Sequence, residues 1–413
     1  MIERFFKDRK EIQRFRCNPL GPHLDSFVEL LSELGYAKST IRLQVLVLAE
    51  FGQWMKDNET GVVDLDEQVA ECFFDECRRC GHYHSGYPAP IRRLLGHLRA
   101  NEIIAFVQPT CDRSPAIQLL NQYEHFLRAE RGLREVTVVG YRPFIHRFLR
   151  HHFGEQPLHL HGLGPSDISD FILRYAHTMS PGRAKLMGTA FRSFFQFLFQ
   201  QGEIDVNLAA SVIPVADWRL SSVPKYLTPQ EVERLLETCN QSTPTGRRNY
   251  AIILLLARLG LRAGEVVALE LGDIDWRSGE IEIPGKGPSR DRLPLIAEVG
   301  EALVAYLRRD RPLVSSRRVF ICMRAPRRGF TNSSTVSTIV ARLLRRAGLN
   351  PQLKGAHLLR HSLATGMLRR GASMVEIGEV LRHRSPSTTE IYAKVDILSL
   401  RSLAQPWPCA GGA

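Results

Sequence analysis

Apolar residues recur at helical spacing through the first hundred positions of the chain. Five of them share one face of a predicted helix: Leu24, Phe27, Leu30, Leu31 and Leu34. Gly35 follows as the expected C-cap, and Ser39 or Thr40 is expected to start a second helix that continues to Trp54. The pattern predicts a helical module over residues 1–112.

A related pattern returns 97 positions later, over residues 113–215. Residues 35–54 align with residues 132–151, sharing a glycine, a threonine, a phenylalanine and most apolar positions. This favours two copies of one helical module, although two unrelated amphipathic helices would show the same periodicity. Phenylalanines crowd residues 184–200, where we expect them to form the core of the second module.

A third domain is predicted over residues 216–413. Pro214 and Pro224 mark a linker, and Thr228, Pro229 and Glu231 form the capping box of a new helix. Short alternating segments at 273–276, 280–283 and 290–295 are separated by turns and predict a three-stranded antiparallel sheet. The predicted fold class is therefore mainly α (α+β), with this small sheet inside an otherwise helical domain.

The composition of the chain indicates which class of partner it binds. The chain of 413 residues carries a net charge of +12, which favours a polyanion, and double-stranded DNA is a better candidate than a membrane surface. We expect neither a signal peptide nor a membrane span, since the apolar run at 251–257 is too short to cross a bilayer. Eight scattered cysteines suit a reducing cytoplasm.

Two arginines and a histidine suggest a phosphate site. His357 and Arg360 are three positions apart, so they share one helix face, and Arg262 starts another helical segment. Each guanidinium can hold two oxygens of a phosphodiester, and two such groups could stabilise a phosphorane without a metal. His361 lies about 100° round the helix from Arg360 and is expected to pack or cap.

Lys286, His383 and Tyr392 complete the candidate chemistry. Lys286 lies in a Pro-Gly-Lys-Gly-Pro turn, from which it could protonate a leaving oxygen or simply face solvent. Tyr392 could attack the phosphate or serve only in packing. A free tyrosine has a pKa of about 10, so nearby cations and a hydrogen-bonding histidine would have to favour its ionised form.

Other polar groups are weaker candidates. Arg183, Lys185 and Arg192 could contact DNA from the second module or form a solvated helix face. Four zinc-compatible residues are crowded into eight positions without a second distant pair: Cys77, Cys80, His82 and His84. His357 and His361 lack the glutamate of an H-E-x-x-H zinc motif. We expect no metal.

These segments resemble the tyrosine recombinase (phage integrase) family. Residues 225–398 carry the resemblance most strongly, and residues 114–212 resemble the family's SAM-like core-binding domain more loosely. The resemblance implies six catalytic positions: Arg262, Lys286, His357, Arg360, His383 and Tyr392. Glu265 fills the family's supporting acidic position. Arg382 departs from the family pattern, because a glycine usually precedes the last histidine.

The resemblance implies a site-specific recombinase or integrase. Tyr392 would attack DNA to form a 3′-phosphotyrosine and release a 5′-hydroxyl, without cofactor, ATP or metal. A homotetramer would act on two duplexes, alone or with related recombinases, and the residues after Tyr392 could dock on a neighbouring subunit. The extra N-terminal module favours a mobile element and transposition. The alternatives are a topoisomerase-like nicking-closing enzyme, a catalytically silent DNA-binding protein and, least favoured, a helix-turn-helix regulator.

Overall fold

The computed structural model describes residues 1–105, 114–154, 156–215, 223–284 and 290–395. The chain divides into two compact units, one comprising Met1–Phe106 with Val223–Ala413 and the other Val107–Ser222. Three main hydrophobic cores fall within residues 2–104, 119–212 and 227–359. Helices dominate throughout, and one three-stranded antiparallel sheet is present among the described residues, which confirms the predicted fold class.

The N-terminal module is helical from its first turn. Five α-helices follow the short 3-10 turn Ile2–Arg4: α1 Arg9–Arg16, α2 Gly21–Glu33, α3 Lys38–Asp57, α4 Glu67–Arg79 and α5 Pro88–Ala100. Gly35 adopts a φ of +78°, so it ends α2 as predicted. The predicted start of α3 is wrong, because Ala37 is the N-cap and Ser39 and Thr40 already lie inside the helix.

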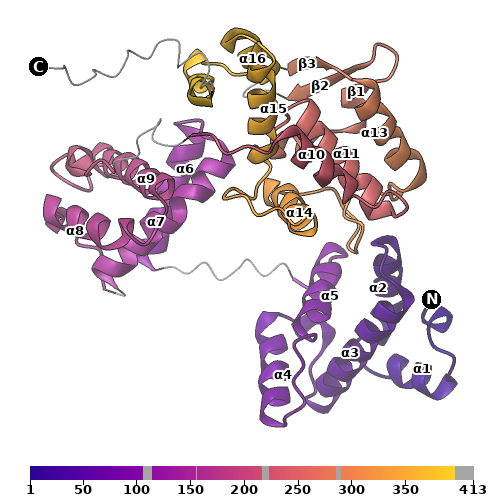
Figure 1. Ribbon diagram of the computed structural model, residues 1–413. Coiled ribbons are helices and arrows are strands. Elements are labelled where there is room, and N and C mark those ends of the chain that lie inside the picture. Colours follow the sequence, from indigo (N-terminus) through magenta and orange to yellow (C-terminus); the bar gives the residue numbers. More distant parts are fainter. Residues whose placement is uncertain (106–113, 155, 216–222, 285–289, 396–413) are drawn as a thin grey trace, which may run out of the picture. The chain divides into compact units, whose positions relative to one another are not determined.

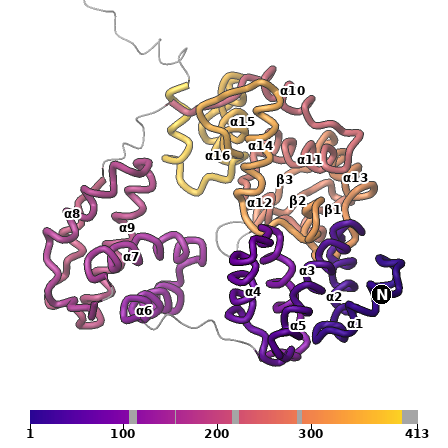
Figure 2. The backbone as a smooth tube through the Cα atoms, turned by 90° about the horizontal axis from the view of Figure 1, so that it is seen from below, coloured from indigo at the N-terminus to yellow at the C-terminus, as the bar shows by residue number. Residues whose placement is uncertain are grey.

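The module at 114–215 contains four helices, which Figure 2 shows as one compact group: α6 Pro115–Ala129, α7 Glu135–Phe153, α8 Pro165–Ala176 and α9 Pro181–Gln200. Four phenylalanines of α9 are buried in its core, as predicted, whereas a fifth, Phe199, is exposed: Phe191, Phe194, Phe195 and Phe197 are the buried ones. Phe148 of α7 packs against Phe171, Phe191 and Phe195 at ring distances of 5.3–5.7 Å.

The two modules bury corresponding positions. Six residues of α3 and six of α7, each pair 97 positions apart, are buried: 41, 44, 47, 48, 51 and 52 in the first, and 138, 141, 144, 145, 148 and 149 in the second. The 3-10 turns Val62–Asp64 and Leu160–Gly162 follow at matching places. After the last helix, Glu102 and Gly202 both adopt a positive φ, of 58° and 73°.

The C-terminal domain carries the sheet, whose strands run alongside one another in Figure 1. Strand β2, Glu280–Pro284, pairs antiparallel with both β1, Ile274–Asp275, and β3, Arg290–Pro294. The described part of this domain also has seven α-helices: α10 Pro229–Glu237, α11 Pro244–Arg258, α12 Ala263–Ala268, α13 Ala297–Arg309, α14 Ser333–Arg346, α15 His357–Arg369 and α16 Met374–Val380. Two 3-10 turns follow, Pro386–Thr388 and Glu390–Val395.

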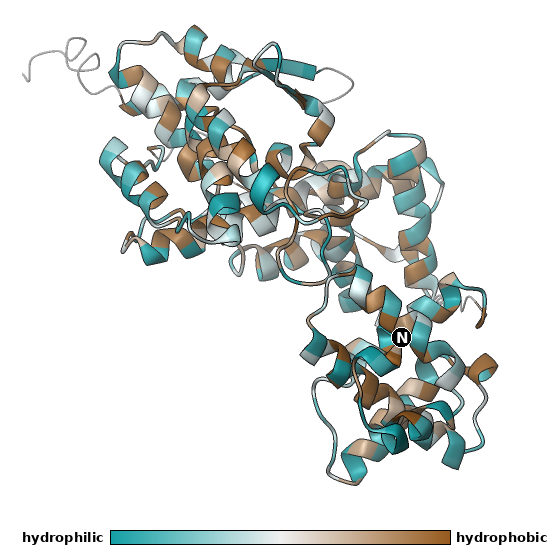
Figure 3. Cartoon of the chain, turned by 90° about the vertical axis from the view of Figure 1, so that its right-hand side faces the viewer, coloured by the Kyte–Doolittle hydropathy of each residue, from teal (hydrophilic) through white to brown (hydrophobic). Residues whose placement is uncertain are grey.

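Helix α11 forms the centre of this domain. Every residue from Ala251 to Ala257 is buried, because neighbouring helices cover α11 on all sides, whereas the outer helices in Figure 3 show a hydrophilic and a hydrophobic face. The predicted capping box starts α10: Thr228 Oγ1 accepts from the Glu231 N–H at 3.3 Å, and the Glu231 carboxylate accepts from the Thr228 N–H at 2.8 Å.

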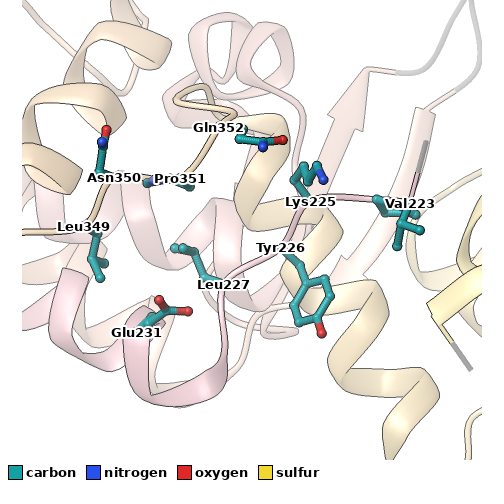
Figure 4. Close-up of a pocket in the computed structure, with 10 residues that line it drawn as sticks. Val223, Lys225, Tyr226, Leu227, Glu231, Leu349, Asn350, Pro351 and Gln352 are labelled. Atoms are coloured by element: carbon teal, nitrogen blue, oxygen red, sulfur yellow. The ribbon is translucent and has the colours of Figure 1, made fainter. Parts of the chain in front are cut away.

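The first segment of the domain is anchored to α15. The Leu227 N–H donates to Ser362 Oγ at 2.8 Å, and the Arg369 guanidinium lies over the Tyr226 ring. A hollow of about 440 Å³ lies between this segment and the loop at 349–352, as Figure 4 shows. None of the predicted catalytic residues lines this hollow, so it is separate from the candidate chemistry.

Phe148 is expected to carry much of the stability of the 114–215 module. Its ring is 1% exposed, so Phe148→Ala should destabilise the module by about 3–5 kcal/mol. Native-state hydrogen exchange of α7 and α9 amides in the full chain measures this. Phe199→Ala is the matched control, because Phe199 of α9 is 44% exposed. Equal protection in both variants would contradict the assignment of this core.

Candidate active site

Arg360 forms hydrogen bonds to two loops that are far apart in the sequence, one before Arg262 and one before Arg382. Its guanidinium comes from α15 and is 4% exposed. It donates to the carbonyl oxygen of Gly260, two residues before Arg262, and to that of Leu381, which directly precedes Arg382. Burial, followed by the charges of Arg262 and Arg382, lowers the pKa of Arg360 to about 10. It therefore stays protonated at neutral pH and fixes both loops.

Glu265 lies between two arginines. Arg262 is the N-cap of α12 and donates from Nη1 to Glu265 Oε1 at 2.7 Å, while Arg382 Nη2 donates to Glu265 Oε2 at 2.7 Å. Burial would raise the pKa of Glu265, but the charge of Arg382 and the hydrogen bonds from Arg262 outweigh it and hold this pKa below its usual value. Glu265 is thus an ionised support for both guanidinium groups.

Arg382 occupies a backbone position that favours glycine. It follows α16 in a turn where its N–H donates to Glu379 O and the next N–H, of His383, donates to Gly378 O. Its φ is +53°, a left-handed conformation that costs a residue with a Cβ roughly 1–2 kcal/mol. The family's usual glycine fits this turn, whereas the arginine sends a long side chain back toward Glu265.

The three site histidines are held neutral. Burial lowers the pKa of His357, and the charges of Arg360 and Arg262 lower it further. Burial, with His357 and Arg360, lowers the pKa of His361 to about 4. Burial, with Arg360 and Arg262, likewise lowers the pKa of His383 to about 4, and its Nδ1 lies 2.8 Å from Thr389 Oγ1. At neutral pH each imidazole is therefore uncharged.

Tyr392 is buried against α15. Its hydroxyl lies 2.9 Å from His361 Nδ1, and the residue is 2% exposed. Burial raises the pKa of Tyr392 to about 12, although the charge of Arg360 opposes the shift. The cations near this phenol thus do not overcome its desolvation in the structure. Tyr392 is a protonated hydroxyl whose neighbour is a neutral imidazole.

His361, which was expected to pack or cap, packs against Tyr392 and contacts its hydroxyl. The angle of about 100° from Arg360 was a sound inference for groups on α15 alone. Tyr392, however, comes from the separate turn Glu390–Val395, which covers the face of α15 on which His361 lies. The sequence showed only that a histidine follows Arg360 directly, because the contact with Tyr392 is set by tertiary packing.

Lys286 lies outside the described residues. The strands that flank it are described, and they pair as far as Pro284 with Arg290. Arg183 and Lys185 are exposed on α9, and Arg183 lies 5.5 Å from the centre of the Phe144 ring. Arg192 is half-buried and donates to Val212 O at 3.2 Å, so part of its guanidinium has a structural partner.

The crowded cysteines do not gather with the histidines. Cys77 is buried in α4, where burial raises the pKa of its thiol, whereas Cys80, His82 and His84 are outside the core. Within the described ranges, no group of three or more histidine, cysteine, aspartate or glutamate side chains is placed to hold a metal ion. Among the same residues, no helix is both long and apolar enough to cross a membrane.

The structure brings three arginines, three histidines and a tyrosine together in one domain, and comparison with known proteins gives the family of the chain. Residues 225–397 match the phage integrase family, and residues 120–202 match the N-terminal SAM-like domain of phage integrases. The chain belongs to the phage integrase family and is a tyrosine recombinase, an enzyme of site-specific DNA strand transfer.

Relatives extend over nearly the whole chain. The integrase/recombinase y4rA of Sinorhizobium fredii is 43% identical over 393 residues, which cover 94% of this chain and 95% of the relative. Tyrosine recombinase XerD of Listeria monocytogenes is 30% identical and covers 69% of this chain and 96% of its own. The crystal structure of XerH recombinase on its difH substrate shares the fold, with a TM-score of 0.55 and 22% identity over 70% of this chain and 85% of XerH.

Both His361 and His383 are expected to remain neutral at pH 5.5, because each has a pKa of about 4. NMR titration of ¹³C-labelled histidines in the full chain measures this, and His361→Gln and His383→Gln assign the signals. An unfolded histidine has a pKa of about 6.5, so each contributes stability above that pH which is lost as the pH falls toward 4. Midpoints near 6.5 for both would contradict the described burial.

Proposed function

We propose that this chain cuts and rejoins DNA through Tyr392. The hydroxyl oxygen of Tyr392 attacks a phosphodiester, a 3′-phosphotyrosine forms, and the 5′-oxygen leaves. Attack by a 5′-hydroxyl of a second strand then releases Tyr392 and joins the new strands. The observation that carries this proposal is the placement of Arg360 between the loops of Arg262 and His383, with Tyr392 packed on the same helix.

Each predicted catalytic residue has a role in this reaction. Arg262 and Arg360 bind the non-bridging oxygens, and Arg360 still has three of its five N–H groups after its two carbonyl bonds. His357 and His383 stabilise the phosphorane by hydrogen bonding, and Glu265 orients Arg262. Lys286 is assigned the protonation of the leaving 5′-oxygen from the family pattern alone.

His361 is assigned the proton of the nucleophile. As Tyr392 Oη bonds to phosphorus, its hydrogen passes to His361 Nδ1, and it returns when the phosphotyrosine is broken. The 2.9 Å contact is within the reach required of a general base. His361 is neutral in the unliganded site, so in one tautomer its Nδ1 accepts the hydrogen bond from the Tyr392 hydroxyl.

The partner is double-stranded DNA, and the reaction takes place in the cytoplasm. Exchange between two duplexes needs four nucleophiles, which a homotetramer supplies, alone or with related recombinases. Residues 396–413, the segment expected to dock on a neighbour, lie outside the described residues. The similarity to the integrase/recombinase y4rA over nearly the full chain favours integration or transposition of a mobile element.

Three domains serve this activity. Residues 216–413 form the catalytic domain and residues 113–215 the core-binding domain, in which Arg183, Lys185 and Arg192 contact the DNA backbone. We propose that residues 1–112 are a second copy of the core-binding module, on the strength of the matching buried positions and helix ends.

Tyr392→Phe should abolish covalent attachment to DNA, because no oxygen remains to attack phosphorus. The full chain is incubated with a pool of nicked duplexes of randomised sequence, and protein-linked DNA is recovered after denaturation and sequenced. Recovery of an enriched site by the wild type and none by Tyr392→Phe is the expected result. Tyr250→Phe is the matched control, because Tyr250 is a partly buried tyrosine away from the site. Equal recovery by Tyr392→Phe would refute the proposal.

His361→Ala should slow cleavage of the recovered duplex by about 10²–10⁴-fold, the usual contribution of a general base. Added imidazole should restore part of the rate, since the small molecule can enter the space left by the ring. Binding of the duplex, measured separately, should change little. Cleavage at the wild-type rate would remove His361 from the reaction, and a slow rate insensitive to imidazole in a folded variant would reduce it to packing.

A further inference from the structure

We propose that Arg382 is an additional phosphate-binding residue of this site. The inference rests on the proposed function, and it concerns a position that the six predicted catalytic residues do not include. Arg382 lies where the family pattern has glycine, between Leu381 and His383. Arg382 shares its carboxylate partner, Glu265, with Arg262, and it follows Leu381, whose carbonyl accepts from Arg360.

The first observation is the state of the guanidinium. The side chain of Arg382 is 6% exposed, and only Nη2 has a hydrogen-bond partner, Glu265. Its Nε and Nη1 are buried without a hydrogen-bond acceptor among the described residues. Asp291 lies 3.9 Å from Nε, which is too long for a hydrogen bond. Buried N–H groups of a charged side chain require an acceptor, and a phosphodiester supplies two oxygens.

The second observation is the charge around it. Arg262 and Arg382 share one ionised carboxylate, Glu265, and the charge of Arg360 is close enough to affect the same cluster, while the adjacent imidazoles are neutral. Asp291, the other nearby carboxylate, is half-exposed and more distant. The described cluster therefore has an excess of positive charge in a buried place, and it is complementary to a phosphate whose negative charge grows during attack.

The third observation is the backbone. Arg382 holds a φ of +53°, at a helix end where glycine would be unstrained. A residue kept in an unfavourable conformation with an unsatisfied side chain is a reasonable candidate for a functional role. Packing alone does not explain an arginine at position 382, because its buried N–H groups without acceptors are unfavourable in the unliganded site.

Substrate charge provides the test. The duplex captured by the wild-type chain is prepared with its normal phosphate or with either stereoisomer of a neutral methylphosphonate at the cleaved position. Arg382→Gly should slow cleavage of the phosphate by about 10- to 100-fold, the value of a hydrogen bond to a charged group. With at least one methylphosphonate the slowing should shrink to less than about threefold, because the charge that Arg382 offsets is gone.

Two controls separate the possible outcomes. Arg308→Ala removes one exposed charge from α13 and should slow both substrates alike or not at all. Arg382→Lys should retain part of the phosphate rate. Equal slowing of all substrates by Arg382→Gly, or no slowing, would overturn the role of Arg382 while leaving Tyr392 as nucleophile. If the wild type captured no duplex, the proposed function itself would fail.

A second readout does not depend on DNA cleavage. Inorganic phosphate, added against chloride at constant ionic strength, should raise the Tm of the wild-type chain more than that of Arg382→Gly. Arg308→Ala should behave as the wild type. Equal stabilisation of all three proteins by phosphate would contradict the proposal, whether or not a cleavable duplex has been found.

Discussion

The buried guanidinium of Arg360 is the interaction on which the site depends. It is a charge held inside the domain, and such a charge is tolerated only when its N–H groups find acceptors. Two carbonyl oxygens provide them, at Gly260 and Leu381. Because those carbonyls belong to loops far apart in the sequence, satisfying one side chain also fixes the positions of Arg262 and Arg382. Removing Arg360 would therefore release two segments of the site as well as one phosphate ligand.

The same low-polarity surroundings set the protonation of the site. The histidines are neutral and Tyr392 is protonated, since burial disfavours the charged form of each. In the proposed reaction, a bound phosphate would offset the charges of the arginines and supply the phosphorus atom that Tyr392 attacks. Tyr392 is 2% exposed. The proposed attack therefore requires the turn Glu390–Val395 to move so that the hydroxyl can contact the DNA.

Much of this could be predicted from the sequence because the signals were local. Periodicity gave the helices, the alternating segments gave the three strands, and Thr228 with Glu231 marked the start of α10. The family pattern then selected Arg262, Arg360 and Tyr392. The contact between His361 and Tyr392 could not be predicted, because the two residues come from different segments. The sharing of Glu265 between two arginines depends on the turn after α16. Such contacts are set by packing, which periodicity does not encode.

The central claim is that Tyr392 forms the bond to DNA, and the most direct measurement is the position and polarity of that bond. Trypsin digestion of the captured complex, followed by nuclease treatment and mass spectrometry, should yield the peptide 385–394, in which Tyr392 is the sole tyrosine, carrying a nucleotide through its 3′-phosphate. A nucleotide on any other residue, or one joined through its 5′-phosphate, would contradict the account.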